Sequence, residues 1–214
     1  MAPRPKPPPP TTILFVRHGQ TATTGKSLPG RAPGLHLAPA GREQADAVAA
    51  RVAALPRIDA VYSSPLERTR ETAAPIAKAR GLKVVAERGL VECDFGEWTG
   101  AELKDLFKKP EWTTVQRYPS SFRFPGGESF VEMSARICAT AVKLREQHPG
   151  GVVVAVSHAD PIKAVVANAV GTHLDLFQRI VISTCSVTVI TYGAGGPAVL
   201  TVNSTGDLAG LAPS

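Results

Sequence analysis

Cysteine is scarce in this sequence, and long apolar runs are missing. The 214 residues include only 3 cysteines, Cys93, Cys138 and Cys185, which are widely spaced and form no CxxC pair. This usage argues against a disulfide framework or a cysteine zinc site and favours a reduced, cytoplasmic compartment. No stretch reaches the roughly 18 uninterrupted apolar residues that a membrane-spanning helix needs. We therefore expect neither a disulfide-stapled secreted domain nor a membrane-spanning protein.

Charge and aromatic content are also modest. Lys and Arg number 24 against 18 Asp and Glu, and aromatic residues make up 6% of the chain. A surface that binds nucleic acid would need clustered basic residues with interleaved aromatics, whereas here the basic residues are scattered. We expect no nucleic-acid or membrane partner, and a weak preference for small anionic molecules. The oligomeric state stays open, with a homodimer among the options.

The two ends of the chain differ from its middle. Residues 1–11 are rich in proline and lack the apolar core of a secretory signal, so we expect a disordered tail there. Residues 206–214 are expected to be flexible. The remaining residues, 12–205, have a length that suits one domain.

Apolar segments rich in β-branched residues alternate with segments of helical spacing. Strands are expected near residues 13–16, 58–62, 83–86, 151–156, 180–183, 186–191 and 198–202. Helices are expected at 41–55, 64–80, 129–147 and from about 159 to 170. Ser64 and Ser129 are predicted to cap two of these helices, each with a glutamate three residues later. This order predicts an α/β fold, a three-layer sandwich with a mostly parallel central sheet and helices on both faces.

Cationic and imidazole side chains follow three of the predicted strands. Arg17 and His18 come directly after the first strand, His158 follows the strand at 151–156, and Arg68 lies shortly after the strand at 58–62. The carboxyl ends of parallel strands share one edge of a sheet, where ligands bind. Two arginines and two histidines gathered there, beside a helix N-terminus, predict a pocket for a phosphate group.

Six segments in order resemble the histidine phosphatase superfamily, which includes the phosphoglycerate mutases. They are LFVRHGQT, HLAPAGREQA, SSPLERTRETA, VECDFGEWTG, PGGES and VAVSHADP, and the resemblance covers about residues 12–203. It implies a phosphoglycerate mutase-like fold and a phosphomonoesterase that needs no metal or cofactor. The expected substrate is a small phosphorylated metabolite, hydrolysed through a phosphohistidine intermediate.

The resemblance also implies roles for single residues. His18 would attack phosphorus while a backbone carbonyl holds its other ring nitrogen, and Glu92 would act as proton donor and later as base. The phosphate oxygens would be bound by Arg17, Arg68 and a protonated His158. Secondary contacts to phosphate or substrate are expected from Gln20, Thr21 and Ala159. Ala159 stands where members of this superfamily commonly have glycine.

Residues 93–125 lack clear periodicity and are expected to form a lid over the pocket. Five basic residues in this segment predict a substrate with a second anionic group; they are Lys104, Lys108, Lys109, Arg117 and Arg123. The segment is short for a mutase of this superfamily, which favours hydrolysis over the alternative of a phosphomutase. A phosphoprotein phosphatase and a phosphate-binding protein without turnover are further alternatives.

Overall fold

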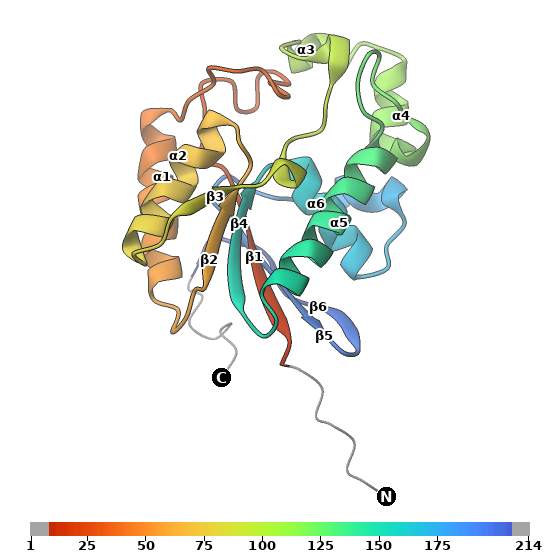
Figure 1. Ribbon diagram of the computed structural model, residues 1–214. Helices are drawn as coiled ribbons and strands as arrows, with labels where there is room; N and C mark the ends of the chain where they lie inside the picture. The colour runs from red at the N-terminus through yellow and green to blue at the C-terminus, as the bar shows by residue number, and fades with distance from the viewer. Residues whose placement is uncertain (1–8, 207–214) are drawn as a thin grey trace, which may run out of the picture.

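A six-stranded mixed sheet forms the middle layer of the protein. The computed structural model describes residues 9–206 and is shown in Figure 1. The strands are β1 (Thr11–Arg17), β2 (Ala60–Ser63), β3 (Val84–Ala86), β4 (Val152–Ser157), β5 (Val187–Gly193) and β6 (Gly196–Ser204), in the spatial order β3-β2-β4-β1-β5-β6. The pairs β1–β4, β2–β4 and β2–β3 are parallel, and β5 and β6 extend the sheet in antiparallel pairs.

Helices cover both faces of this sheet, as the sequence predicts. The longer helices are α1 (Pro39–Ala53), α2 (Glu67–Ala79), α5 (Phe130–Gln147) and α6 (Ala159–Ala169). Figure 1 shows α1 and α2 on one face and α5 and α6 on the other. The predicted α/β three-layer sandwich is therefore confirmed.

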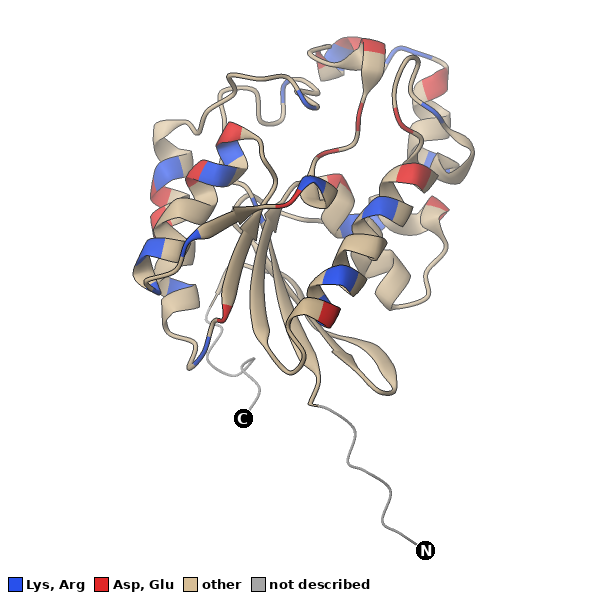
Figure 2. Ribbon diagram, in the orientation of Figure 1, with Lys and Arg blue, Asp and Glu red and all other residues tan. Residues whose placement is uncertain are grey.

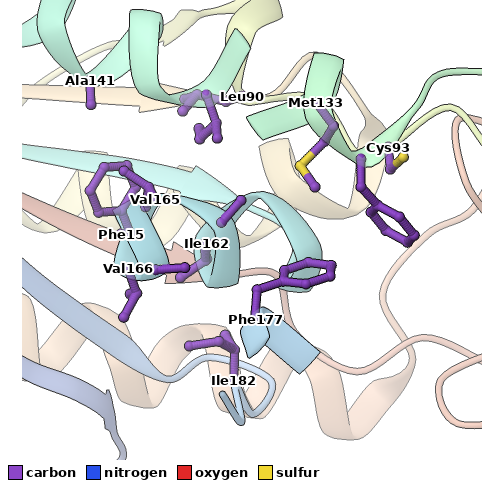
Figure 3. Close-up of a cluster of buried hydrophobic side chains, with 14 of the residues drawn as sticks. Phe15, Leu90, Cys93, Met133, Ala141, Ile162, Val165, Val166, Phe177 and Ile182 are labelled. Atoms are coloured by element: carbon purple, nitrogen blue, oxygen red, sulfur yellow. The ribbon is translucent and has the colours of Figure 1, made fainter. Parts of the chain in front are cut away.

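Each face has its own apolar core. On the side of α5 and α6, Phe15 of β1 packs in one cluster with Met133, Ile162 and Phe177, and Figure 3 shows these side chains together. On the other side, α1 and α2 bury their small apolar residues against alternate side chains of β1 and β4. β1 and β4 are buried on both faces, which explains why their sequences are continuous apolar runs.

The register of the central strands decides where the site residues meet. Arg17 at the end of β1 pairs with Ser157 at the end of β4, and Ser63 at the end of β2 pairs with Val156. Three strands thus end at the same level of the sheet. The residues that follow them, among them His18 and His158, are brought to one edge.

Charged residues lie mainly on the helices and loops. Figure 2 shows Lys and Arg interspersed with Asp and Glu along α1, α2 and α5, whereas the strands are nearly free of charge. In the part of the chain that the structure describes, no helix has both the length and the apolar character needed to cross a membrane.

The predicted lid consists of short helices joined by loops. Between residues 93 and 125 the elements are η2 (Gly96–Trp98), α3 (Leu103–Leu106), α4 (Glu111–Arg117) and η3 (Pro119–Ser121). Two further short 3₁₀ helices, η1 (Arg88–Leu90) and η4 (Leu174–Arg179), precede and follow this region in the chain. Figure 1 places α3 and α4 on the side of the molecule to which β1 and β4 point.

Several predicted boundaries are wrong. Thr11, the last residue of the predicted tail, is buried and begins β1, where it pairs with Tyr192. Residues 1–8 and 207–214 lie outside the described residues. No strand forms at 180–183 among the described residues. The helix predicted from Ser64 begins at Glu67 with Leu66 as its N-cap, whereas the capping box of Ser129 and Glu132 on α5 is confirmed.

Candidate active site

A cavity of about 400 Å³ lies at the end of β1 and at the N-terminus of α6. Of the residues that the sequence analysis proposes for the site, its lining includes Arg17, His18, Thr21, Glu92 and Ala159. Arg68 and His158 are fully buried directly behind this wall, where they contact one another. Gln20 is exposed and is not among the lining residues, and its backbone N–H donates to the side-chain oxygen of Gln44.

His18 is buried, and its ring is oriented by its own loop. Nδ1 lies 2.8 Å from the carbonyl oxygen of Gly19, to which it donates a hydrogen bond as the sequence predicts. Burial, together with the guanidiniums of Arg68 and Arg17, lowers the pKa of His18 to about 3. The neutral ring therefore carries its proton on Nδ1 and leaves a lone pair on Nε2. An unprotonated Nε2 is what a nucleophilic imidazole requires.

Glycine is required where this loop passes the start of α1. A Cβ on Gly19 would collide with the carbonyl oxygen of Gly41, and a Cβ on Gly41 would collide with the carbonyl oxygen of Gln20. The glycines of the RHG and AGRE segments thus let two backbones touch. This contact holds the loop that carries His18 against α1.

The two predicted arginine ligands keep unpaired donors in the buried site. Arg17 donates from Nη1 to the carbonyl oxygen of Ile182 at 2.7 Å, and Arg68 donates from Nη2 to that of Gly30 at 2.8 Å. The Nε of Arg17 and both Nε and Nη1 of Arg68 are buried without a hydrogen-bond partner among the described residues. A buried unpaired donor costs about 1–3 kcal/mol, more when charged. Phosphate oxygens would satisfy such donors.

His158 differs from the expectation of a protonated third cation. Burial and the neighbouring Arg68 guanidinium lower its pKa well below the usual value, so the ring is neutral in this structure. Arg68 Nη2 donates to its Nδ1 at 3.2 Å, and its Nε2 donates to Ser64 Oγ at 2.9 Å. The rings of His158 and His18 are 5.2 Å apart in an edge-to-face arrangement. Ser64 Oγ also accepts from the backbone N–H of Leu66 at 3.5 Å, and α2 begins after Leu66.

Glu92 is the one carboxyl of the predicted set, and it is buried in the cavity wall. Burial, reinforced by the negative charge of Asp160, raises the pKa of Glu92 to about 7. The backbone N–H of Cys93 donates to Oε1 at 2.9 Å and opposes part of this shift. A carboxyl that holds its proton up to neutral pH fits the proton-donor role.

The backbone of Glu92 is fixed by a network of two arginines and one glutamate. Its carbonyl oxygen accepts from Arg31 Nε at 2.8 Å and from Arg136 Nη2 at 3.3 Å. Both guanidiniums also bind the carboxylate of Glu128, each at 2.9 Å. The loop that contains Arg31, the start of the α5 region and the segment of Glu92 are distant in the sequence, and they meet in this network.

The basic residues of the predicted lid do not reach the cavity. Among the described lining residues, the lid supplies Phe95 and Leu103, and the loops 21–29 and 178–182 supply much of the rest. Lys104, Lys108 and Arg123 instead form ion pairs with nearby carboxylates. The basic residues of the lid therefore do not support the prediction that the substrate has a second anionic group.

Sequence reasoning missed several polar side chains of the cavity wall, among them Asp160, Lys163 and Gln178. Asp160 and Lys163 are three residues apart at the start of α6, directly after the strand end that carries His158. That spacing on a helix face was the available signal. Within the described residues, no three His, Cys, Asp or Glu side chains gather as a metal site would require.

Comparison with known proteins agrees with this geometry. The family model of the histidine phosphatase superfamily (branch 1) matches residues 13–205. The bifunctional protein Rv2228c of Mycobacterium tuberculosis is 34% identical over 93% of this chain, which spans only 55% of that relative's length. Phosphoserine phosphatase 1 of Hydrogenobacter thermophilus is 31% identical over 90% of this chain and 92% of that protein.

A solved structure shows the same fold. It is a phosphoserine phosphatase of Entamoeba histolytica in complex with phosphoserine, which is 26% identical, with a TM-score of 0.82 over 91% of this chain and 98% of that one. Fold, motifs and family model agree over nearly the whole described chain. The protein belongs to the histidine phosphatase superfamily.

Proposed function

We propose that this protein hydrolyses the phosphomonoester of a small metabolite through a phosphohistidine intermediate on His18. One observation carries the proposal. A neutral imidazole with a free Nε2 lies in the same cavity as a carboxyl with a pKa of about 7 and beside unpaired guanidinium donors. These are a nucleophile, an acid and an anion clamp within one site.

In the first step, Nε2 of His18 attacks phosphorus and the bond to the leaving oxygen breaks. Glu92 gives its proton to that oxygen, so the alcohol leaves without a negative charge. The free donors of Arg17 and Arg68 bind the nonbridging oxygens, where negative charge is spread in the transition state. The hydrogen bond from Nδ1 to Gly19 stabilises the positive charge that the ring gains.

In the second step, water attacks the phosphorus of phosphohistidine. Glu92, now a carboxylate, takes a proton from this water, and the bond between phosphorus and Nε2 breaks. Inorganic phosphate is released, His18 is again neutral, and Glu92 is again protonated. His158 acts in this scheme as a neutral group that orients Arg68, because its Nδ1 accepts from that guanidinium.

The relatives support hydrolysis of small phosphorylated molecules. Of the two phosphoserine phosphatases named above, one is similar in sequence and the other in fold, and this chain covers nearly the full length of both. A cytoplasmic location, expected from the cysteine usage, belongs to the same proposal.

Hydrolysis of p-nitrophenyl phosphate in the presence of EDTA tests the proposal. The wild type should release nitrophenol and inorganic phosphate in equal amounts, and His18→Ala should lose all but a small fraction of this activity. Activity that survives in His18→Ala would show that His18 is not the nucleophile. Transfer of the phosphoryl group to an added alcohol, without release of inorganic phosphate, would favour the phosphomutase.

A further inference from the structure

Three neighbouring polar side chains in the cavity wall neither attack phosphorus, nor bind the phosphate, nor transfer a proton in the proposed mechanism. Asp160 and Lys163 come from α6, and Gln178 comes from the short helix η4. All three line the cavity that also contains His18 and Glu92. They are therefore placed to contact whatever part of a substrate extends from its phosphate group.

These side chains form one fixed cluster around the ammonium group of Lys163. Nζ lies 3.2 Å from Asp160 Oδ1 and donates to Gln178 Oε1 at 2.9 Å, and it stands 5.8 Å from the centre of the Phe177 ring. The side chains of Asp160 and Lys163 are each only 16% exposed. An ammonium has three N–H groups, so one is left to donate to a ligand.

The charges of the cavity constrain the ligand. Arg17 and Arg68 together match the two negative charges of a phosphate dianion, and Asp160 matches Lys163. A leaving group with a net charge would leave one charge in this shielded place without a counterpart, which is unfavourable. A ligand carboxylate that accepted from the remaining N–H of Lys163 would also lie beside the carboxylate of Asp160, and the two like charges would repel.

A hydroxyl group fits this cluster without breaking it. One hydroxyl can accept from the free N–H of Lys163, and a neighbouring hydroxyl can donate to the carboxylate of Asp160. The hydroxyls of Thr21, Thr23 and Thr24 in the same cavity offer further partners of this kind. The wall as a whole is polar but electrically balanced.

We infer that Asp160, Lys163 and Gln178 bind the hydroxyl groups of an uncharged polyol leaving group, so that the substrate is a polyol or sugar phosphate. The inference rests on the proposed function for the phosphate end of the site. It replaces the anionic leaving group that the lid residues suggested from the sequence.

Matched substrates test this inference. Glycerol 1-phosphate and propyl phosphate differ in two hydroxyls, and 3-phosphoglycerate has a carboxylate in place of the terminal CH2OH group of glycerol 1-phosphate. The wild type should have a higher kcat/KM for glycerol 1-phosphate than for either of the others. Lys163→Met should lower the ratio of kcat/KM for glycerol 1-phosphate over propyl phosphate by about tenfold or more, because a site built around a hydroxyl discriminates strongly. Lys104→Met, in an exposed ion pair outside the cavity, should leave the ratio unchanged.

Other results would overturn the inference. One is that Lys163→Met leaves the ratio of kcat/KM for glycerol 1-phosphate over propyl phosphate unchanged. The other is that the wild type prefers 3-phosphoglycerate and that Lys163→Met abolishes this preference. Gln178→Met provides the same reading if Lys163→Met does not fold. Calorimetric binding of glycerol 1-phosphate and propyl phosphate to His18→Ala gives the ratio without turnover. A wild type that hydrolyses nothing would therefore contradict the proposed function, while the binding ratio would still decide on the hydroxyl site.

Discussion

His18 and Glu92 are both kept neutral by burial, although the pKa of one falls and that of the other rises. Desolvation is the largest cause in each case, lowering the pKa of His18 to about 3 and raising that of Glu92 to about 7. Between these values the base is free of its proton and the acid retains its own. One physical effect thus prepares both groups for the first step at the same pH.

This arrangement predicts a pH dependence that Asp160 controls. With propyl phosphate, kcat/KM should fall as pH rises through about 7, because Glu92 then loses the proton that the alkoxide needs. Asp160→Asn removes a negative charge that helps to raise the pKa of Glu92, so this pKa should fall. The alkaline limb of the pH profile, where kcat/KM decreases, should therefore move to lower pH. Propyl phosphate has no hydroxyl for the Lys163 cluster, so the shift reports on Glu92. A limb that stays in place, or moves to higher pH, would contradict the assignment.

Motifs identified the ionisable residues of the site, but the protonated state expected for His158 is wrong. Arg17, His18 and Glu92 are found in the cavity because each stands at a fixed place after a strand or within a strong motif. The neutral state of His158 follows from the guanidinium of Arg68 beside it, a contact across 90 positions of sequence. No local pattern reports such a contact.

The strands and helices that carry the site were predictable where their signals were redundant. β1 and β4 are apolar on both faces, and α5 begins with a capping box whose two hydrogen bonds both form. The start of α2 differs from the prediction, since the helix begins at Glu67 and the hydroxyl of Ser64 accepts from both His158 and the backbone N–H of Leu66. Local capping signals do not report a contact with a residue as distant in the sequence as His158.

The segment at 180–183 shows a second limit of local patterns. Its apolar, β-branched residues favour a strand, yet it runs along the cavity and contributes Ile180, Val181 and Ile182 to the lining. The carbonyl oxygen of Ile182 holds Arg17 instead of pairing within the sheet. Composition alone does not separate a strand from an apolar wall of a site.

Across the whole molecule, Glu92 depends on residues far from it in the sequence. Arg31 lies in the loop after β1, Glu128 just before α5, and Arg136 within α5, and together they hold the carbonyl oxygen of Glu92. Glu128 is the centre of this network because it binds both guanidiniums. The PGGES segment signalled family membership, whereas this contact became visible only in the fold.

Glu128→Gln should weaken proton donation more than phosphate binding. Loss of the carboxylate leaves two guanidiniums without their shared counterion, so the loop that carries Glu92 should shift. We expect kcat/KM for propyl phosphate to fall by about tenfold, with a smaller loss for p-nitrophenyl phosphate, whose leaving group departs without a proton. Glu146→Gln, an exposed change near the end of α5, is the control. Equal losses for both substrates would indicate that Glu128 supports only the stability of the fold.

Rapid-quench kinetics of Glu92→Gln with p-nitrophenyl phosphate test the phosphohistidine on His18 most directly. The first step needs no acid for this leaving group, but the second step needs the base that the substitution removes. We predict a burst of about one nitrophenol per site, followed by slow turnover, with acid-labile, base-stable phosphate bound to the protein. Glu92→Gln combined with His18→Ala should show neither signal. A Glu92→Gln protein that turns over without a burst and without bound phosphate would contradict the account.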